Sequence, residues 1–501
     1  MPAHDESSQR MTRALWLALA AILLVHFVAR VQNVGHLLTW DEAMNIRTVV
    51  SHVEGANDQY AVWFSRHPPM MATMLAWLAP LERGFIHRAE VLAIAISCCV
   101  LLALFAVVKK TFGPRTALFA AACYAVMPGA VFYDTWIKQD GLVALFGLIA
   151  ILFWLQRRAL MAGIFLGVCC LAKENAIYFA AALFLLWLFE RPWNWRNLAA
   201  IAIAPALVAG WWYALFSTAI ADQFSFATGV QITKVEQWDK PLLYFFQKLP
   251  LDLGWPGLVL AIIGLVVCGA DRRSARADGA VCTTAGIWPL ALIVPGYAIL
   301  TLMHGKAPWL NIALLPALAI AQGVACDWML TRLVKNLSAI ITGLITGVAP
   351  VLLAMIALDF IIKTDYEKFM QRQDYGTWRG ANASRAAALE LKSRLRPGQR
   401  VLVTPMWYWT DVQQGICPIF TCYLGNPFSP EILHLVYGPT TMTAEKFVKT
   451  VREKNIAWAM LAPPPGDGEK QLLQPLIRAY HLKPIIPDGQ MNCLFDVRPL
   501  R

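Results

Sequence analysis

Two adjacent carboxylates follow the first apolar stretch of the chain, Asp41 and Glu42 in the segment 38–43. At the boundary between membrane and water a carboxylate is partly desolvated, which raises its pKa and suits it to take a proton from a hydroxyl or an amine. A structural interpretation competes, because acidic residues are favourable in the first turn of a helix that Asn45 and Ile46 would continue. The pair is thus a candidate general base or a helix N-terminus.

Basic side chains lie beside several other apolar stretches. Arg66 and His67 precede Pro68 and Pro69. The prolines are a helix-start signal by themselves, whereas a guanidinium beside a helix N-terminus is a good phosphate ligand. Single lysines stand at three other helix ends, namely Lys138, Lys173 and Lys306. One such lysine can snorkel harmlessly to water, but three near the acidic segment indicate a shared anion site.

Asp140 opens a further apolar stretch. It is either the N-cap of that helix or a residue that positions the Asp41-Glu42 segment or the hydroxyl or amine that reacts there. With Asp41 and Glu42 it could hold Mg²⁺ or Mn²⁺. Because the lysines already supply positive charge, we expect no metal cofactor. No Cys/His spacing resembles a zinc site.

The composition requires a bilayer around most of the chain. Of 501 residues, 58% are hydrophobic and 15% charged, and the mean hydropathy is +0.51, which is too apolar for a soluble protein of this length. Apolar stretches of roughly 17 to 25 residues fill the chain up to about residue 360. We therefore expect a membrane domain over residues 1–361, with a first outer loop at 33–85, and a soluble α/β domain over 362–501.

The formal net charge of +11 could suggest nucleic acid, but the basic residues are scattered through short loops instead of forming one patch. They fit the positive-inside rule, because Arg10 and Arg13 place the N-terminus in the cytoplasm and later pairs alternate with about eleven spans. The first span, about 14–31, is too long for a signal peptide and lacks a cleavage site. The C-terminal domain then lies outside the membrane.

The tail alternates short apolar runs with amphipathic segments. This pattern predicts strands at 401–404, 457–461 and 493–497, and helices at 444–453 and 470–480. Cys417 and Cys422 lie close enough in sequence for a disulfide in an oxidising compartment, although spacing alone does not decide this.

The order of these features resembles the GT-C superfamily of membrane glycosyltransferases, in particular bacterial relatives of protein O-mannosyltransferases and the aminoarabinose transferases of lipid A. The resemblance rests on the acidic pair, the basic residues before Pro68-Pro69, Asp140, Lys173, and Gly305-Lys306-x-Pro before a span with Leu315-Pro316. It covers roughly residues 14–330. It implies a polyprenyl-phosphate-linked sugar donor and a bacterial inner-membrane location with a periplasmic C-terminal domain.

On this resemblance Asp41 matches the acidic catalytic position, and Lys173 and Lys306 match lysines near the donor phosphate. Arg88 fits a basic position at the outer end of the second span. Some relatives carry Glu-Lys where this chain has Arg66-His67, so the phosphate ligand stays open between these two residues. Lys138 completes the expected donor phosphate site.

The hypothesis is an inverting transfer in which Asp41, assisted by Glu42, is the general base and Asp140 supports it. Because the leaving phosphate is a stable anion, only cations are needed to stabilise it. The acceptor would be a glycan, a lipid or a protein. A polyprenyl-lipid flippase and a silent envelope scaffold are the alternatives, although transporters place charges near the midplane and often show inverted repeats.

Overall fold

The chain is described here from a computed structural model. It describes residues 3–39, 41–43, 45–46, 49, 68–78, 85–190, 192–217, 221, 240–277, 286–333, 348–355, 378–403, 418–424, 432–434, 443–461, 474–487 and 493–500. Contacts divide the chain into two compact units. The helical unit comprises Met1–Gly35, Ser65–Met71 and Gly84–Gln373, and the sheet unit comprises His36–Phe64, Ala72–Arg83 and Asp374–Arg501. The segment with Asp41 and Glu42 is thus grouped with the C-terminal part of the chain.

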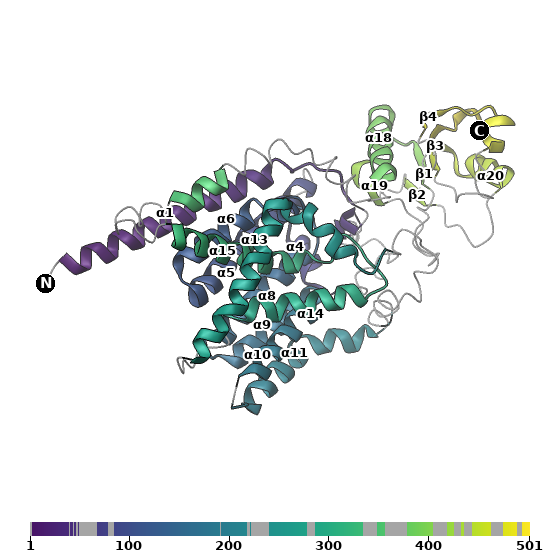
Figure 1. Cartoon of the computed structure of the whole chain (residues 1–501). Helices are drawn as coiled ribbons and strands as arrows, with labels where there is room; N and C mark the ends of the chain where they lie inside the picture. Colours follow the sequence, from purple (N-terminus) through teal and green to yellow (C-terminus); the bar gives the residue numbers. More distant parts are fainter. Residues whose placement is uncertain are drawn as a thin grey trace. The chain divides into compact units, whose positions relative to one another are not determined.

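The helical unit is a bundle of apolar helices (Figure 1). Its helices are α1 (Ala3–Val31), α5 (Phe85–Phe112), α6 (Pro114–Ala125), α7 (Pro128–Tyr133), α8 (Asp140–Leu155), α9 (Ala159–Ala172), α10 (Ile177–Phe189), α11 (Trp195–Leu215), α13 (Tyr244–Ala277), α14 (Trp288–Leu302) and α15 (Leu315–Leu333). The 3-10 turns η1 (Glu174–Ala176) and η4 (Ile312–Leu314) join α9 to α10 and precede α15. Helix α4 (Met70–Leu78) follows Pro68 and Pro69.

Several of these helices are long and apolar enough to cross a membrane. The segments are Arg13–Val31, Phe85–Phe112, Trp195–Leu215, Tyr244–Gly269 and Ile312–Leu333. Shorter apolar helices cover Asp140–Leu155, Ala159–Ala172, Glu174–Phe189 and Trp288–Leu302. The prediction of a polytopic α-helical membrane protein is confirmed, and the predicted first span, about 14–31, coincides with the apolar segment Arg13–Val31.

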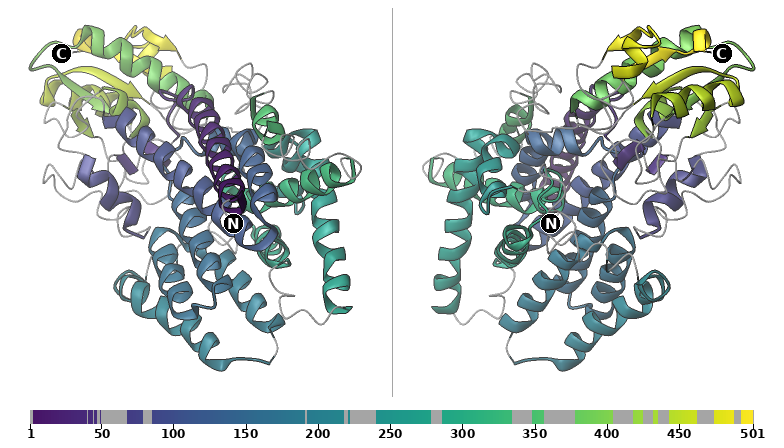
Figure 2. Two further views of the ribbon diagram at one scale, coloured as in Figure 1. Left: turned by 90° about the vertical axis from the view of Figure 1, so that its left-hand side faces the viewer. Right: turned by 90° about the vertical axis from the view of Figure 1, so that its right-hand side faces the viewer.

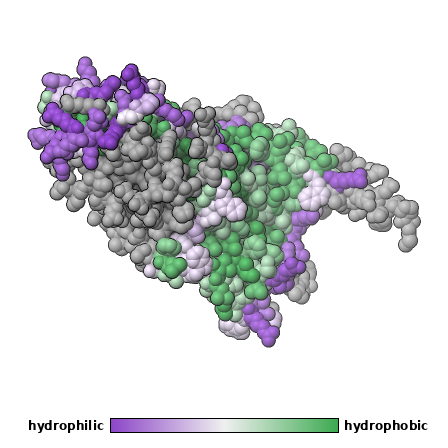
Figure 3. Space-filling view, turned by 180° about the vertical axis from the view of Figure 1, so that it is seen from behind, coloured by the Kyte–Doolittle hydropathy of each residue, from purple (hydrophilic) through white to green (hydrophobic). Residues whose placement is uncertain are grey.

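The outer surface of the bundle is apolar. Leu207, Leu215 and Val266 are 77%, 71% and 66% exposed, and Figure 3 shows hydrophobic side chains covering one face of the helices. In a soluble protein such a surface would be a large exposed apolar patch. Here it is the face that meets lipid tails.

Backbone interruptions place short connections between the helices. Helix α6 stops at Ala125, and Pro128 starts the separate short helix α7. Helix α13 changes direction at Gly254, whose φ of 70° is one that L side chains rarely adopt. The residues after α7 therefore form a compact connection, 134–139, rather than a continuous helix.

Small residues allow the helices to approach closely. Gly163 and Gly167 of α9 face α11, where a Cβ on Gly167 would lie 2.6 Å from Cβ of Val208. Gly264 of α13 faces α15, and a Cβ there would overlap the carbonyl oxygen of Ala321. Such spacing is typical of membrane helix pairs, which associate by close packing. Helix α9 packs against both α8 and α11, and Figure 2 gives two further views of the bundle.

The sheet unit contains a five-stranded mixed sheet in the order β2-β1-β3-β5-β4. The strands are β1 (Arg400–Val403), β2 (Ile432–His434), β3 (Ile456–Leu461), β4 (Pro484–Pro487) and β5 (Cys493–Asp496), and the helices are α18 (Trp378–Arg394), α19 (Pro418–Leu424), α20 (Ala444–Lys454) and α21 (Gln474–Arg478). β1 pairs in parallel with β2 and β3, whereas β5 is antiparallel to β3 and β4. The predicted α/β character is confirmed, and β2, β4, α18 and α19 are additions.

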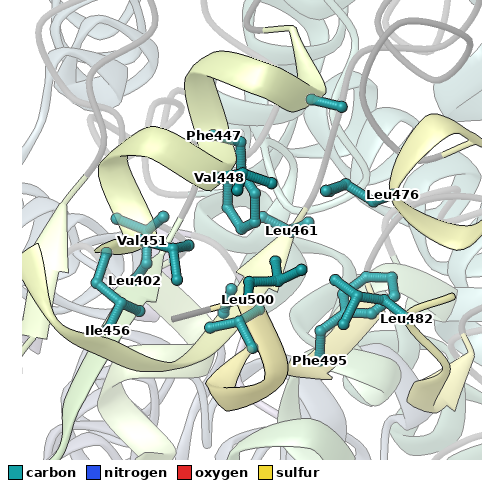
Figure 4. Close-up of a cluster of buried hydrophobic side chains, with 13 residues drawn as sticks. Leu402, Phe447, Val448, Val451, Ile456, Leu461, Leu476, Leu482, Phe495 and Leu500 are labelled. Carbon is teal, nitrogen blue, oxygen red and sulfur yellow. The ribbon is translucent and has the colours of Figure 1, made fainter. Parts of the chain in front are cut away.

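Two apolar cores hold this sheet. One lies under α20 and includes Phe447, Leu461 and Phe495 (Figure 4). The other joins α18 and α19 to the sheet through Leu391, Phe420 and other buried residues. β3 is buried along its whole length, as expected for a central strand covered on both faces.

The contact between α13 and α15 gives a first test of this packing. We expect Gly264→Ala to lower the melting temperature of the detergent-solubilised protein by several degrees, because even one methyl group would collide with Ala321 and overpacking costs about 1–3 kcal/mol. Gly210→Ala on α11 is the matched control, since no heavy atom lies within 4 Å of its added Cβ. An unchanged melting temperature for Gly264→Ala would contradict this packing.

Candidate functional site

The first feature of the site is an ion pair between α8 and the turn after α9. Lys173 donates from Nζ to both carboxylate oxygens of Asp140, at 3.0 and 2.9 Å, and Asn175 donates to Oδ1 at 3.2 Å. Asp140 is 1% exposed and Lys173 is 8% exposed. The backbone of Lys173 is fully extended between α9 and η1.

This geometry corrects the N-cap interpretation of Asp140. Asp140 is the first residue of α8, and Gln139 stands at the N-cap without a side-chain capping bond. The Asp140 carboxylate is engaged by Lys173 and Asn175. Its role in the fold is therefore to join α8 to the α9–α10 turn.

Lys138 links the connection before α8 to the loop that carries Lys306. Its ammonium lies 3.3 Å from the ring centroid of Trp309 and 4.7 Å from that of Trp136, an arrangement in which the ring faces stabilise the cation. Lys306, three residues before Trp309, donates to the carbonyl oxygen of Met303 at 2.6 Å. The structure thus brings together the segments of Lys138, Lys173 and Lys306, all of which are buried.

A second buried ion pair joins the same region. Lys248 donates to both carboxylate oxygens of Asp252, at 2.7 and 2.6 Å, and Asn311 donates to Asp252 at 2.7 Å. The Lys248 ammonium also lies 4.7 Å from the ring centroid of Tyr133. Sequence analysis missed this pair, although its i, i+4 spacing in an apolar context was a usable signal.

The helical unit also contains a small cavity with room for roughly one water molecule. Its lining comes from α5, from the connection 133–140 and from η4, and includes Ser97, Asp134, Trp136, Lys138 and Asp140. A lysine and two aspartates facing one cavity in an apolar bundle are expensive unless they pair or bind a ligand. The three charged side chains therefore make this cavity a candidate ligand site.

Behind the cavity lies a fully buried network around Asp134. Arg30 of α1 donates to Asp134 at 2.7 Å and to the Ala125 carbonyl at 2.9 Å. Ser97 donates to Asp134 at 2.6 Å, and Tyr124 donates at 3.2 Å. Arg30 lies in the last turn of the first span and is completely buried there, and a buried ionisable residue in a span is itself a signal of function or structure. Sequence analysis did not use that signal.

Arg88 differs from these paired cations. Its Nε and Nη2 atoms are buried and have no hydrogen-bond partner among the residues that the structure describes. Nearby on α5, Glu90 accepts the backbone N–H of Gly35 at 2.9 Å and interacts with His87 at 3.0 Å. Buried guanidinium N–H groups without acceptors are costly, so Arg88 is suited to receive an anion.

The acidic pair lies in the sheet unit, and its two members have different surroundings. Glu42 is fully buried: one carboxylate oxygen accepts the Thr39 N–H at 2.8 Å, and the other lies 2.9 Å from Nε2 of His36. The spacing of Thr39 and Glu42 is that of a capping box, so Glu42 stabilises a helix start. Asp41 is only half-buried, which makes it the more accessible carboxylate.

Arg66 and His67 lie outside the described residues, as does Cys417. Pro68 is buried just before α4. Cys422 is buried, and its thiol donates to the carbonyl oxygen of Ala43 at 3.5 Å. Among the residues that the structure describes, no three His, Cys, Asp or Glu side chains are grouped so as to hold a metal ion.

Part of the chain matches a known protein family. Residues 66–213 match the family described as dolichyl-phosphate-mannose-protein mannosyltransferase. This region contains Arg88, Lys138, Asp140 and Lys173. No curated protein sequence matches the chain.

The fold of the chain is similar to solved structures over nearly its whole length. ArnT from Cupriavidus metallidurans bound to undecaprenyl phosphate has a TM-score of 0.62 at 16% identity, covering 96% of this chain and 97% of ArnT. The apo state of that ArnT gives 0.59 at 17% identity, with 97% and 98% covered. The Archaeoglobus fulgidus oligosaccharyltransferase in complex with Zn and sulfate gives 0.52 at 12% identity, with 88% and 67% covered.

The Arg30 network gives a second test of the packing of the helical unit. Asp134→Leu should strongly destabilise the protein, because removing one member of a buried pair costs about 3–5 kcal/mol. The double variant Arg30→Met/Asp134→Leu should lose less, since it leaves no buried charge alone. Thermal unfolding in nanodiscs measures both. If the double variant is less stable than Asp134→Leu, the two charges do not depend on each other.

Proposed function

We propose that the chain transfers a sugar from a polyprenyl-phosphate-linked donor to an acceptor at the outer face of a bacterial cytoplasmic membrane. The observation that carries this proposal is the match of residues 66–213 to a family whose description contains a polyprenyl-phosphate sugar. The ArnT structure with undecaprenyl phosphate supports the same donor class. The acceptor is a glycan, a lipid or a protein.

The donor phosphate is assigned to the helical unit. Arg88 offers buried N–H groups without acceptors in the described residues, and Lys138 faces the cavity beside Asp140. Lys173 binds Asp140, and the loop of Lys306 reaches Lys138 through Trp309. The resemblance to the family implies a further cation at Arg66 or His67. These groups stabilise the negative charge that grows on the leaving phosphate, so no general acid is required.

Asp41 is assigned as the general base and Glu42 as its support. Both Glu42 oxygens already interact with His36 and Thr39, which suits Glu42 to hold the turn rather than to accept a proton. Asp41 is more accessible and precedes it directly. A nucleophile attacking opposite the leaving phosphate gives inversion at the sugar carbon. The acceptor O–H or N–H bond breaks as its proton passes to Asp41.

The membrane topology extends this assignment. The apolar helices and the alternation of basic loops support about eleven spans with a cytoplasmic N-terminus. The last predicted span, about 337–361, lies mostly outside the described residues. Its described part, 348–355, is helical. The soluble domain is then periplasmic.

Asp41→Asn tests the reaction. It should lower transfer by about 10²–10⁴-fold, the usual contribution of a general base, without changing the melting temperature. The assay supplies undecaprenyl-phosphate-linked sugars and a cell-envelope extract to the reconstituted protein and measures released undecaprenyl phosphate. Asp496→Asn, which alters a surface pair with Arg498, is the control and should keep full activity.

The same assay separates the competing functions. A flippase would move the labelled lipid between leaflets without releasing undecaprenyl phosphate, and a scaffold would do neither. Full activity in Asp41→Asn would overturn the assignment of the base. No release by the unaltered protein with any sugar in the panel would overturn the transfer reaction.

A further inference from the structure

The hydroxyl of Tyr423 bridges two backbone groups of the segment that leads to Asp41. Leu38 donates its N–H to Tyr423 Oη at 3.0 Å, and Tyr423 donates to the carbonyl oxygen of His36 at 3.2 Å. The two residues of each contact are more than 380 positions apart in the chain. One side chain of the C-terminal part therefore satisfies a donor and an acceptor of the residues just before the candidate base.

The protonation state of Tyr423 suits this bridge. Burial raises the pKa of Tyr423 to about 12, so the hydroxyl keeps its proton at every pH at which the protein would work. A neutral tyrosine donates one hydrogen bond and accepts others. The bridge is therefore present throughout the working pH range and is not a pH switch.

The segment that Tyr423 contacts is also held by hydrogen bonds of its own. Glu42 holds His36 at 2.9 Å and the Thr39 N–H at 2.8 Å, and Ala43 donates to the Thr39 carbonyl at 3.1 Å to close a helical turn. Leu38, Glu42 and Ala43 are completely buried. Asp41 lies within this turn, so a shift of the turn would move its carboxylate.

Tyr423 is itself fixed by the core of the sheet unit. It belongs to α19, whose Phe420 and Leu424 pack with α18 and β1, and its ring packs against the same cluster. The guanidinium of Arg385 on α18 lies 5.4 Å from the centre of the Tyr423 ring. A second contact comes from the adjacent residue, since the Cys422 thiol donates to Ala43 at 3.5 Å. The turn is thus held by a rigid element.

We infer that Tyr423 is a positioning residue for Asp41, so that the C-terminal α/β domain is part of the catalytic machinery rather than only a docking module. This inference rests on the proposed role of Asp41. It requires no contact between Tyr423 and substrate. Because misplacing a catalytic group by about 1 Å can cost about 10²-fold in rate, two lost hydrogen bonds at the turn are enough to matter.

Tyr423→Phe tests the inference, because it removes the hydroxyl and keeps the ring. We expect kcat to fall about tenfold or more with an unchanged KM for the undecaprenyl-phosphate-linked sugar, since the donor site is assigned to the helical unit. Tyr480→Phe is the matched control: Tyr480 packs against the other core of the same domain, and its loss should leave kcat unchanged. Hydrogen exchange at residues 36–43 should rise only in Tyr423→Phe.

A double variant separates positioning from a general loss of structure. In the Asp41→Asn background, Tyr423→Phe should cause no further loss of activity, because residues that act as a unit are not additive. Cys422→Ala tests the same turn through its separate contact and should lower kcat about twofold or more. It also serves if Tyr423→Phe does not fold.

The outcomes distinguish this inference from the proposed function. If Asp41→Asn is inactive but Tyr423→Phe and Cys422→Ala keep the kcat of the unaltered protein, the positioning role is wrong and the general base stands. If Asp41→Asn is fully active, the proposed base fails first. An equal further loss from Tyr423→Phe in both backgrounds would also overturn the positioning role.

Discussion

A charged side chain inside an apolar helical bundle must find its counter-charge within the protein, and this constraint organises the helical unit. Asp134 meets Arg30, Asp140 meets Lys173 and Asp252 meets Lys248. Each carboxylate also accepts a bond from a neutral side chain, from Ser97, Asn175 and Asn311 respectively. Because each charge has a counter-charge and hydrogen bonds, these pairs offset the desolvation penalty of several kcal/mol that an isolated buried ion carries.

The same pairs join the irregular segments between the helices. The Asp140 pair ties the start of α8 to the turn after α9, and the Asp252 triad ties α13 to the loop before η4. Trp309 of that loop lies on Lys138. The cationic side chains are consequently held by rigid partners instead of moving freely in solvent, which is the preorganisation that electrostatic stabilisation of a leaving phosphate needs.

Part of this arrangement was predictable from sequence. Hydropathy located the apolar helices, and Lys138, Lys173 and Lys306 stood out because the orientation of the spans did not require them. The roles of the acidic residues were harder to assign. The Thr39–Glu42 spacing is a capping box and could have shown that Glu42 differs from Asp41. Asp140 was compatible with an N-cap, and only its contact with Lys173 decides otherwise.

The long-range contacts could not be predicted from one sequence. Arg30 and Asp134 are 104 residues apart, and the residues around each of them do not indicate that the two side chains pair. The link between Tyr423 and residues 36–38 is longer still. Secondary structure in the tail was predictable for β1, β3 and β5, whose apolar runs are distinct. β2 has only three residues, too few for a period to show, and β4 begins and ends with a proline, which argues against a strand.

The account rests on a lipid phosphate bound in the helical unit, and native mass spectrometry tests this most directly. The protein is mixed in detergent with undecaprenyl phosphate, and the variants Arg88→Met and Gly210→Ala are compared with the unaltered chain. The account predicts one bound lipid for the unaltered chain and Gly210→Ala, and weaker binding for Arg88→Met. Equal binding by all three, or no bound lipid at all, would contradict it.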